Sequence, residues 1–107
     1  MADKLTEEAI RGRLEAHPEW RLERKQLVRV LRFPRFADGI ELVRRVAVAA
    51  DAMDHHPDID IRYTTVRVAL SSHDAGGVTE RDLRLAAEID RLVEAGTRGS
   101  EILNQDL

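Results

Sequence analysis

Hydrophobic residues in the first third of the chain follow two different spacings. After a candidate N-cap at Thr6, apolar positions one helical turn apart predict a helix over residues 7–16. Residues 20–33 alternate and then form a run rich in Leu and Val, which predicts two strands around a turn near residues 24–25. Two apolar pairs in that run are also compatible with a helix. We expect Trp20 in the core rather than on the surface as a stacking platform.

The longest helical pattern covers residues 36–54. Its apolar positions form two adjacent groups on the helix surface, one of Phe36, Ile40, Val43, Ala47 and Ala50, the other of Leu42, Val46, Ala49 and Met53. The combined arc is wider than one contact with a sheet requires, so the helix either lies deep in its own core or also contacts a second copy of the chain. Because so short a chain has little material to cover a second face, the pattern favours a homodimer or homotetramer through this helix, which Val46→Glu should dissociate.

After Pro57 the apolar spacing becomes two. Residues 58–63 and 66–70 each alternate, but the apolar phase moves from odd to even positions between them. A straight strand cannot change its phase without turning its side chains over, so a tight turn or bulge is expected near residues 64–65. The region therefore predicts a second pair of strands.

The last predicted helix begins at Thr79, after a Gly76-Gly77 loop, and ends by Gly96. We expect residues 97–107 to be a loosely ordered tail, and residues 1–107 to form a single domain. The order is helix, two strands, helix, two strands, helix, with short connections. This order predicts an α+β fold of two layers, in which helices pack on one face of a four-stranded antiparallel sheet.

Composition and charge restrict the functional classes. The 107 residues are 43% hydrophobic and 35% charged with a net charge of −3, which is typical of a soluble globular domain and gives no field to attract nucleic acid or anionic lipid. The absence of cysteine removes disulfides, thiolate metal ligands and a cysteine nucleophile. No apolar run approaches the ~20 residues of a membrane span, and the first residues lack a signal-peptide hydrophobic region. We therefore expect a cytoplasmic protein with neither a membrane nor a nucleic-acid partner.

Three histidines lie at the ends of predicted elements. His55 and His56 end the long helix, and His73 follows the last strand. Imidazole exchanges protons near neutral pH, so three imidazoles in loops predict either acid–base chemistry or a metal site. The metal alternative is the weaker one, because adjacent histidines diverge and no thiolate supports them. The simplest alternative is three histidines exposed to solvent.

Nearby polar residues each allow two interpretations. Asp82 is the N3 residue of a capping box that starts at Thr79, or a carboxylate that orients a histidine, and both roles are compatible. Asp51 and Asp54 lie in the last turn of the long helix, where the helix dipole disfavours anions, so a functional use is the alternative to plain helix-end residues. The Ser71-Ser72 pair either ends the strand or offers hydroxyls to a polar ligand.

These residues resemble the signature of the pterin-4a-carbinolamine dehydratase family. The matching constellation, with its spacing intact, is Asp51, His55-His56-Pro57, Tyr63, His73 and Asp82. The similarity extends over roughly residues 20–93 and includes the segment 77–83. It implies the family's four-stranded antiparallel sheet backed by helices, in agreement with the order derived above.

The resemblance also implies a hydro-lyase that removes water from 4a-hydroxytetrahydrobiopterin to give quinonoid dihydrobiopterin, within tetrahydrobiopterin recycling. In that case His55, His56 and His73 carry protons with Asp82 as their partner, and neither a metal nor a cofactor is required. The residues expected to line the pterin pocket are Asp54, His55, His56, Pro57, Ser71, Ser72, His73 and Asp74. A pterin-dependent hydroxylase would act in the same pathway.

Two positions depart from the family pattern. Many relatives carry an aromatic residue where this chain has Ile59 and a cysteine where it has Ala75, which changes pocket detail and substrate range rather than reaction type. The family also includes members that bind a transcription factor as a dimerisation cofactor. The alternative function is therefore a non-catalytic oligomerisation or partner-binding module of the same fold.

Overall fold

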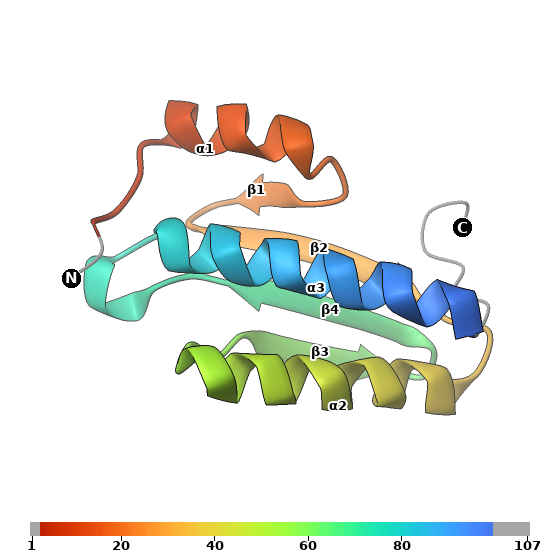
Figure 1. Ribbon diagram of the computed structural model, residues 1–107. Coiled ribbons are helices and arrows are strands. Elements are labelled where there is room, and N and C mark those ends of the chain that lie inside the picture. The colour runs from red at the N-terminus through yellow and green to blue at the C-terminus, as the bar shows by residue number, and fades with distance from the viewer. Residues whose placement is uncertain (1–2, 100–107) are drawn as a thin grey trace.

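The computed structural model describes residues 3–99 (Figure 1). Along the chain the elements are α1 (Glu7–Arg13), η1 (Leu14–Ala16), β1 (Arg21–Glu23), β2 (Gln26–Arg32), α2 (Phe36–Met53), β3 (Asp58–Arg62), β4 (Thr65–Leu70), η2 (His73–Ala75) and α3 (Glu80–Gly99). Their order matches the one expected from the hydrophobic pattern. No helix within residues 3–99 is long and apolar enough to cross a membrane.

The four strands form one antiparallel sheet in the order β1-β2-β4-β3. Leu27 of β2 pairs with Leu70 of β4, and Ile59 of β3 pairs with Val68 of β4. Because side chains alternate across a strand, this register places all four on the same face of the sheet. That face is the one covered by α2 and α3, which lie side by side in Figure 1. The predicted two-layer α+β fold is confirmed.

Both hairpin turns lie close to where the alternation changes. The β1–β2 turn occupies residues 24–25, and the β3–β4 turn occupies residues 63–64. Arg24 and Tyr63 adopt positive φ angles of 59° and 54°. Tight two-residue hairpin turns require such a left-handed conformation, which glycine adopts most easily. The change of apolar phase between residues 58–63 and 66–70 thus reflects the β3–β4 turn.

Two helix ends differ from expectation. The first helix tightens into the 3-10 turn η1 over its last three residues, a common ending for a helix that stops before a proline. The expected end of the last helix at Gly96 is wrong, because α3 continues through Gly99. A single glycine costs about 1 kcal/mol relative to alanine but does not by itself end a helix. Of the tail predicted over residues 97–107, the first three residues are helical and the others lie outside the described residues.

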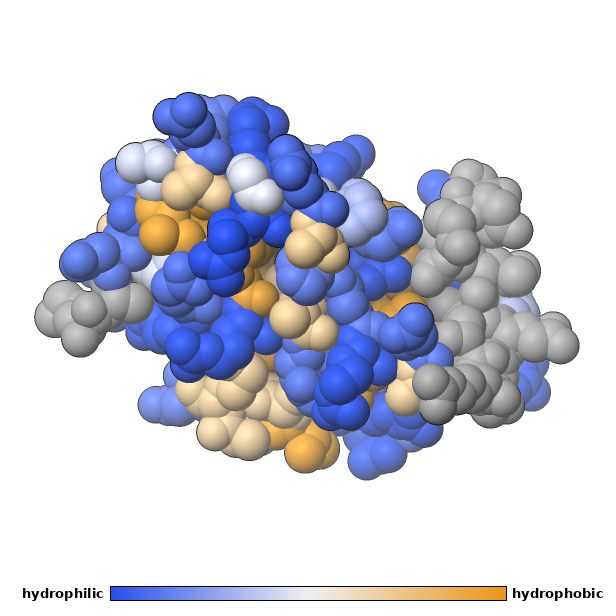
Figure 2. Space-filling view, turned by 45° about the horizontal axis from the view of Figure 1, so that its top comes forward, coloured by the Kyte–Doolittle hydropathy of each residue, from blue (hydrophilic) through white to orange (hydrophobic). Residues whose placement is uncertain are grey.

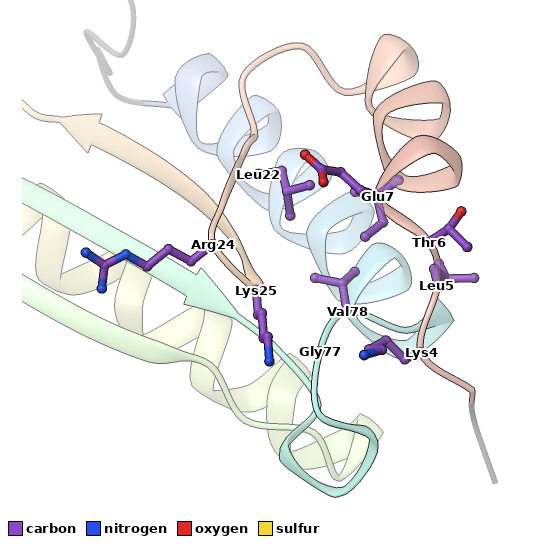
Figure 3. Close-up of a pocket in the computed structure, with 10 residues that line it drawn as sticks. Lys4, Leu5, Thr6, Glu7, Leu22, Arg24, Lys25, Gly77 and Val78 are labelled. Carbon is purple, nitrogen blue, oxygen red and sulfur yellow. The ribbon is translucent and has the colours of Figure 1, made fainter.

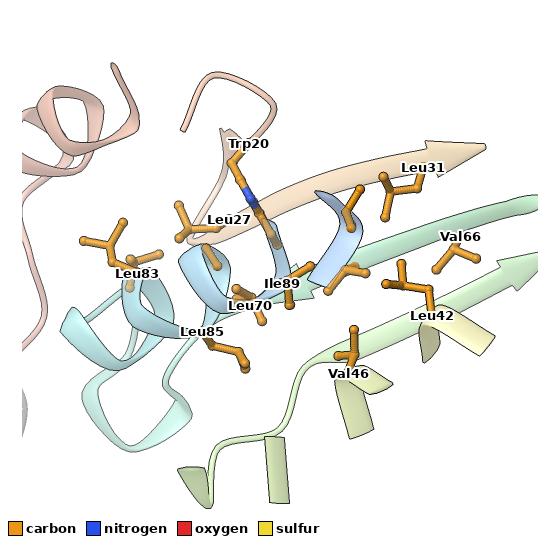
Figure 4. Packing of buried hydrophobic residues seen from close by; sticks show 14 of the residues in the cluster. Trp20, Leu27, Leu31, Leu42, Val46, Val66, Leu70, Leu83, Leu85 and Ile89 are labelled. Atoms are coloured by element: carbon orange, nitrogen blue, oxygen red, sulfur yellow. The ribbon is translucent and has the colours of Figure 1, made fainter. Parts of the chain in front are cut away.

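The core lies between the sheet and the α2–α3 pair (Figure 4). Members from β2, β4 and α3 that are 0% exposed include Leu27, Leu31, Val66, Leu70, Leu85 and Ile89. α2 contributes Leu42, Val46 and Ala50. Val46 is only 1% exposed, so the expectation that Val46→Glu would dissociate an oligomer is wrong. A charge at that position would instead enter the protein's own core.

Another part of α2 remains open to solvent. Phe36 is 50% exposed, Ile40 38% and Val48 61%. Figure 2 shows hydrophobic residues at the lower left of the molecule, where the C-terminal half of α2 runs. The apolar arc of this helix is therefore divided between an inward part and an exposed part.

A buried ion pair joins the first hairpin to α3. Arg29 of β2, whose side chain is 5% exposed, donates to the carboxylate of Asp90. Trp20 Nε1 donates to the same carboxylate at 2.7 Å, and His17 Nδ1 lies 3.0 Å from it. Trp20 is 3% exposed and belongs to the core, as expected. The fourth histidine of the chain thus holds the N-terminal region against α3.

Candidate active site

The predicted site residues lie at one end of the sheet. The end of α2, the start of β3, the end of β4, η2 and the start of α3 meet on the left of Figure 1. This meeting follows from the antiparallel order, because β3 starts at the end of the sheet where its neighbour β4 stops. Segments more than twenty residues apart in the chain therefore contribute to one region.

His55 and Asp82 form the buried centre of this region. His55 Nε2 lies 2.6 Å from Asp82 Oδ1, and the two side chains are 10% and 0% exposed. The other oxygen of Asp82 accepts a hydrogen bond from Ser72 Oγ at 2.8 Å and from the Thr79 backbone N–H at 2.9 Å. Both oxygens of the Asp82 carboxylate are therefore engaged, Oδ2 by two donors and Oδ1 by the imidazole of His55.

Asp82 performs both roles considered from the sequence. Its bond to the Thr79 N–H, together with the bond from the Arg81 backbone N–H to Thr79 Oγ1 at 3.2 Å, forms a capping box at the start of α3. Its other oxygen contacts the imidazole of His55. Thr79 also lies 2.8 Å from Ser72 Oγ through its hydroxyl. The cap of α3 and the histidine partner are therefore one hydrogen-bond network.

The end of α2 separates the two adjacent histidines. Asp54 caps the helix in the left-handed conformation, with φ 52° and ψ 43°. After this turn His55 is buried, whereas His56 is exposed and its Nε2 lies 2.9 Å from Asp51 Oδ1. Asp51 thus has a histidine partner, while Asp54 is exposed. Pro57 follows, half-buried, and leads into β3.

A short loop carries the third histidine. Ser72 N donates to Gly77 O at 2.8 Å and closes the loop at its base, with Gly76 in the left-handed conformation at φ 76°. His73 is exposed, and among the described residues its ring has no hydrogen-bond partner. Asp74 Oδ1 accepts from Arg81 at 2.6 Å, and this guanidinium lowers the pKa of the Asp74 carboxyl.

The structure joins some of the predicted residues directly and leaves others apart. His55, Ser72 and Asp82 share one buried network, His56 pairs with Asp51, and no hydrogen bond links His73 to either of the other histidines. Within residues 3–99 no group of three or more His, Asp or Glu side chains is arranged to hold a metal ion.

Two residues of this region were not assigned to the site from the sequence. Thr79 was recognised only as a helix cap, and its bond to Ser72 requires the loop to fold back. The sequence pattern does not indicate a role for Arg81, because its partner Asp74 lies seven residues earlier on a different element. The Nε atom of Arg81 is buried without a hydrogen-bond partner among the described residues.

A histidine held by a buried carboxylate, with two further histidines exposed at the same end of a two-layer α+β domain, defines a class of site suited to acid–base chemistry. A family model described as pterin 4 alpha carbinolamine dehydratase matches residues 3–92. The chain therefore belongs to the pterin-4a-carbinolamine dehydratase family.

Individual relatives agree with this assignment. A protein of Chloroflexus aurantiacus and one of Acidobacterium capsulatum, both named "Putative pterin-4-alpha-carbinolamine dehydratase", are each 49% identical to this chain over 90 residues. The alignments cover 84% of this chain and 97% and 98% of the relatives.

Solved structures share the fold. A transcriptional coactivator/pterin dehydratase from Brucella melitensis superimposes with a TM-score of 0.80 at 28% identity, over 84% of this chain and 98% of the other. A pterin dehydratase-like protein described as a RuBisCO assembly factor in the alpha-carboxysome gives a TM-score of 0.58 at 23% identity, over 69% and 88% of the two chains. At that identity the second likeness shows the fold alone.

Proposed function

We propose that this protein dehydrates 4a-hydroxytetrahydrobiopterin to quinonoid dihydrobiopterin by histidine acid–base catalysis. The observation that carries the proposal is the buried contact between His55 and Asp82, 2.6 Å long, at the end of the sheet where His56 and His73 are exposed. The capping box of α3 accounts for Asp82 Oδ2 but not for the imidazole at Oδ1, and burial of an imidazole–carboxylate pair costs desolvation energy that a helix cap alone does not require. Membership of the family supports the same reaction.

The hydrogen bonds suggest how the protons move. With Asp82 ionised, Nε2 of His55 donates to the carboxylate, so Nδ1 carries the lone pair and is suited to accept a proton from a ring nitrogen of the substrate. An exposed imidazole, His56 or His73, donates a proton to the departing 4a-hydroxyl, which leaves as water. One proton is taken up and one is given, so the reaction balances without a metal or cofactor.

The remaining pocket residues are assigned to pterin binding. Asp54 and Pro57 precede β3, and the loop of Ser71, Ser72 and Asp74 lies beside His73. Recycling of tetrahydrobiopterin implies a pterin-dependent hydroxylase as the source of the carbinolamine, and we place both proteins in the cytoplasm.

Stopped-flow spectroscopy tests the reaction. The 4a-hydroxytetrahydropterin is generated enzymatically and its dehydration is followed with and without the protein. We expect a catalytic increase in rate that is proportional to protein concentration. Spontaneous rates at all protein concentrations would contradict the proposed activity.

We also propose that α2 forms a homodimer or homotetramer contact. Phe36 and Ile40 lie one helical turn apart and form a short exposed apolar strip of a kind that soluble monomers usually cover. A second copy supplies the same strip, and twofold symmetry is the commonest solution for such a contact.

The same strip supports a second candidate function, a partner-binding module. The name of the Brucella melitensis protein combines a coactivator with a dehydratase. The stopped-flow measurement separates the candidates, because a module without catalysis leaves the rate unchanged.

A further inference from the structure

Both lysines of the chain line one cavity. Of the 17 Lys and Arg residues only Lys4 and Lys25 are lysines, and they meet at a hollow of about 290 Å³ (Figure 3). The walls come from the N-terminal segment, α1, the β1–β2 hairpin and the segment Gly77-Val78. This cavity shares none of the residues assigned to the candidate active site.

The cavity combines an apolar surface with a cationic rim. The apolar side chains are Leu5, Ile10, Leu22 and Val78, and the cationic ones are Lys4, Arg24 and Lys25. Within residues 3–99 none of these three cations has an ion pair. Glu7 is the single acidic residue of the lining, and its carboxylate is bonded to Arg11 at 2.6 Å. No carboxylate of the described residues pairs with these cations, so the lining carries an excess of positive charge.

Backbone features hold the lysines at this position. Leu5 N donates to Val78 O at 2.8 Å, which fixes the N-terminal segment against the segment before α3. A Cβ atom on Gly77 would lie 2.7 Å from Lys4 Cδ, so glycine at this position allows the lysine stem to cross the backbone. Figure 3 shows the amines of Lys4 and Lys25 on either side of Gly77, whereas Arg24 points away.

We propose that this cavity binds a small organic anion with an apolar body, a carboxylate or phosphate ester of about amino-acid size. A volume near the lower limit of about 300 Å³ for ligand pockets suits a ligand of that size. Lysine amines act as compact point charges toward carboxylate and phosphate groups. Because exposed charges are screened by salt, the apolar surface must supply part of the affinity, and an anion without an apolar body is held less tightly.

The cavity shares a wall with the candidate active site. Gly77 O accepts the hydrogen bond from Ser72 N at 2.8 Å, and Val78 directly precedes Thr79. Ser72 and Thr79, the residues that this segment contacts and adjoins, both donate to the carboxylate of Asp82. A ligand in the cavity therefore contacts the segment that supports the His55–Asp82 network.

Titrations followed by NMR test the proposal on ¹⁵N-labelled protein. The probes are 3-phenylpropanoate and phenyl phosphate, with inorganic phosphate and the neutral 3-phenylpropanamide for comparison. We expect saturable shifts of the Gly77 and Val78 amides and of both lysine amines, with a Kd of about 1 mM for at least one aromatic anion. The two aromatic anions distinguish a carboxylate site from a phosphate site. The amide and inorganic phosphate should each bind at least about ten-fold more weakly than the better aromatic anion, because each lacks one of the two required parts.

Two variants and a matched control locate the binding. Lys4→Gln and Lys25→Gln should each weaken binding about ten-fold through loss of a charge-assisted hydrogen bond, whereas Arg32→Gln, at the far end of β2, should leave it unchanged. Equal binding of the amide, equal binding of inorganic phosphate, or insensitivity to both lysine variants would overturn the proposal. The readout requires no turnover, so its failure is distinct from a failure of the proposed dehydratase activity.

Discussion

Replacing Asp82 by asparagine tests whether the buried carboxylate orients His55. Asp82 Oδ2 accepts two hydrogen bonds, from Ser72 and from the Thr79 N–H, whereas Oδ1 accepts only from His55. In the variant the amide oxygen takes the position of Oδ2, because an NH₂ group there would face the Thr79 N–H. The new NH₂ group then faces His55 Nε2, which must become an acceptor. The change therefore moves the imidazole proton from Nε2 to Nδ1.

The expected loss of activity exceeds the expected loss of stability. Three hydrogen bonds to a charged group become bonds to a neutral group, which loses about 1 kcal/mol each. The lower desolvation cost of the amide offsets part of this loss, so we expect the free energy of unfolding to decrease by at most about 2 kcal/mol. A proton on Nδ1 removes the proposed base. An Asp-to-Asn change that fixes the wrong histidine tautomer lowers kcat about 10⁴-fold in a serine protease. For Asp82→Asn we expect a decrease of about 10²–10⁴-fold in the dehydration rate.

Three measurements on the same variant check this reasoning. Urea denaturation gives the stability, stopped-flow dehydration gives the rate, and long-range ¹H–¹⁵N NMR of the imidazole gives the tautomer of His55. Asp38→Asn is the matched control, because it makes the same change in a carboxylate that accepts from Arg35 at 2.9 Å at the start of α2, the opposite end of that helix from His55. It should cost at most about 1 kcal/mol and leave the rate unchanged. A wild-type rate in Asp82→Asn with the proton on Nδ1 would refute the proposed role of His55.

Three further predictions concern the exposed parts of the molecule. His56→Ala and His73→Ala should each lower the dehydration rate about 10²–10⁴-fold at an unchanged urea midpoint, and wild-type rates in both would exclude them as proton carriers. Ile40→Glu should convert the oligomer into a 12.1 kDa monomer in sedimentation with unchanged circular dichroism, whereas a wild-type protein already monomeric at micromolar concentration would refute the contact. Arg81→Gln should raise the pKa of Asp74 toward its ordinary value in an NMR titration. Because Arg81 lowers the pKa of Asp74, the ion pair stabilises the loop at pH values above the ordinary pKa of aspartate, and this stabilisation is lost as the pH falls through the lowered pKa. An unchanged pKa of Asp74 in the variant would contradict the ion pair.

The strands were predictable because alternation reports burial directly. The phase shift after Tyr63 located the β3–β4 turn within a residue, since a change of face has no other simple cause in a strand. α2 was harder to orient. Its two apolar groups are adjacent and similar in hydrophobicity, so the pattern does not say which of them faces the sheet. The structure buries Leu42 and Val46 and exposes Ile40.

The candidate site was predictable in its residue types but not in its connections. His55 and Asp82 are 27 residues apart, and no periodicity reports that their side chains meet. The two adjacent histidines are separated because Asp54 adopts the left-handed conformation. Aspartate tolerates this conformation but also adopts others, so the sequence alone does not predict it. The capping box at Thr79 was visible in the sequence because its partners are three residues apart.

The ion pair between Arg29 and Asp90 also affects when the chain can fold during its synthesis. The two residues are 61 positions apart, and Arg29 is almost completely buried once the sheet is covered. A ribosome adds about 5–20 residues per second, so Arg29 is synthesised roughly 3–12 s before its counter-charge. Until then the first hairpin cannot pack without leaving a guanidinium unpaired in an apolar environment. The nascent chain therefore has a reason to remain open until α3 is nearly complete, and a ribosome stalled before Asp90 would carry an N-terminal half that is accessible to chaperones and proteases.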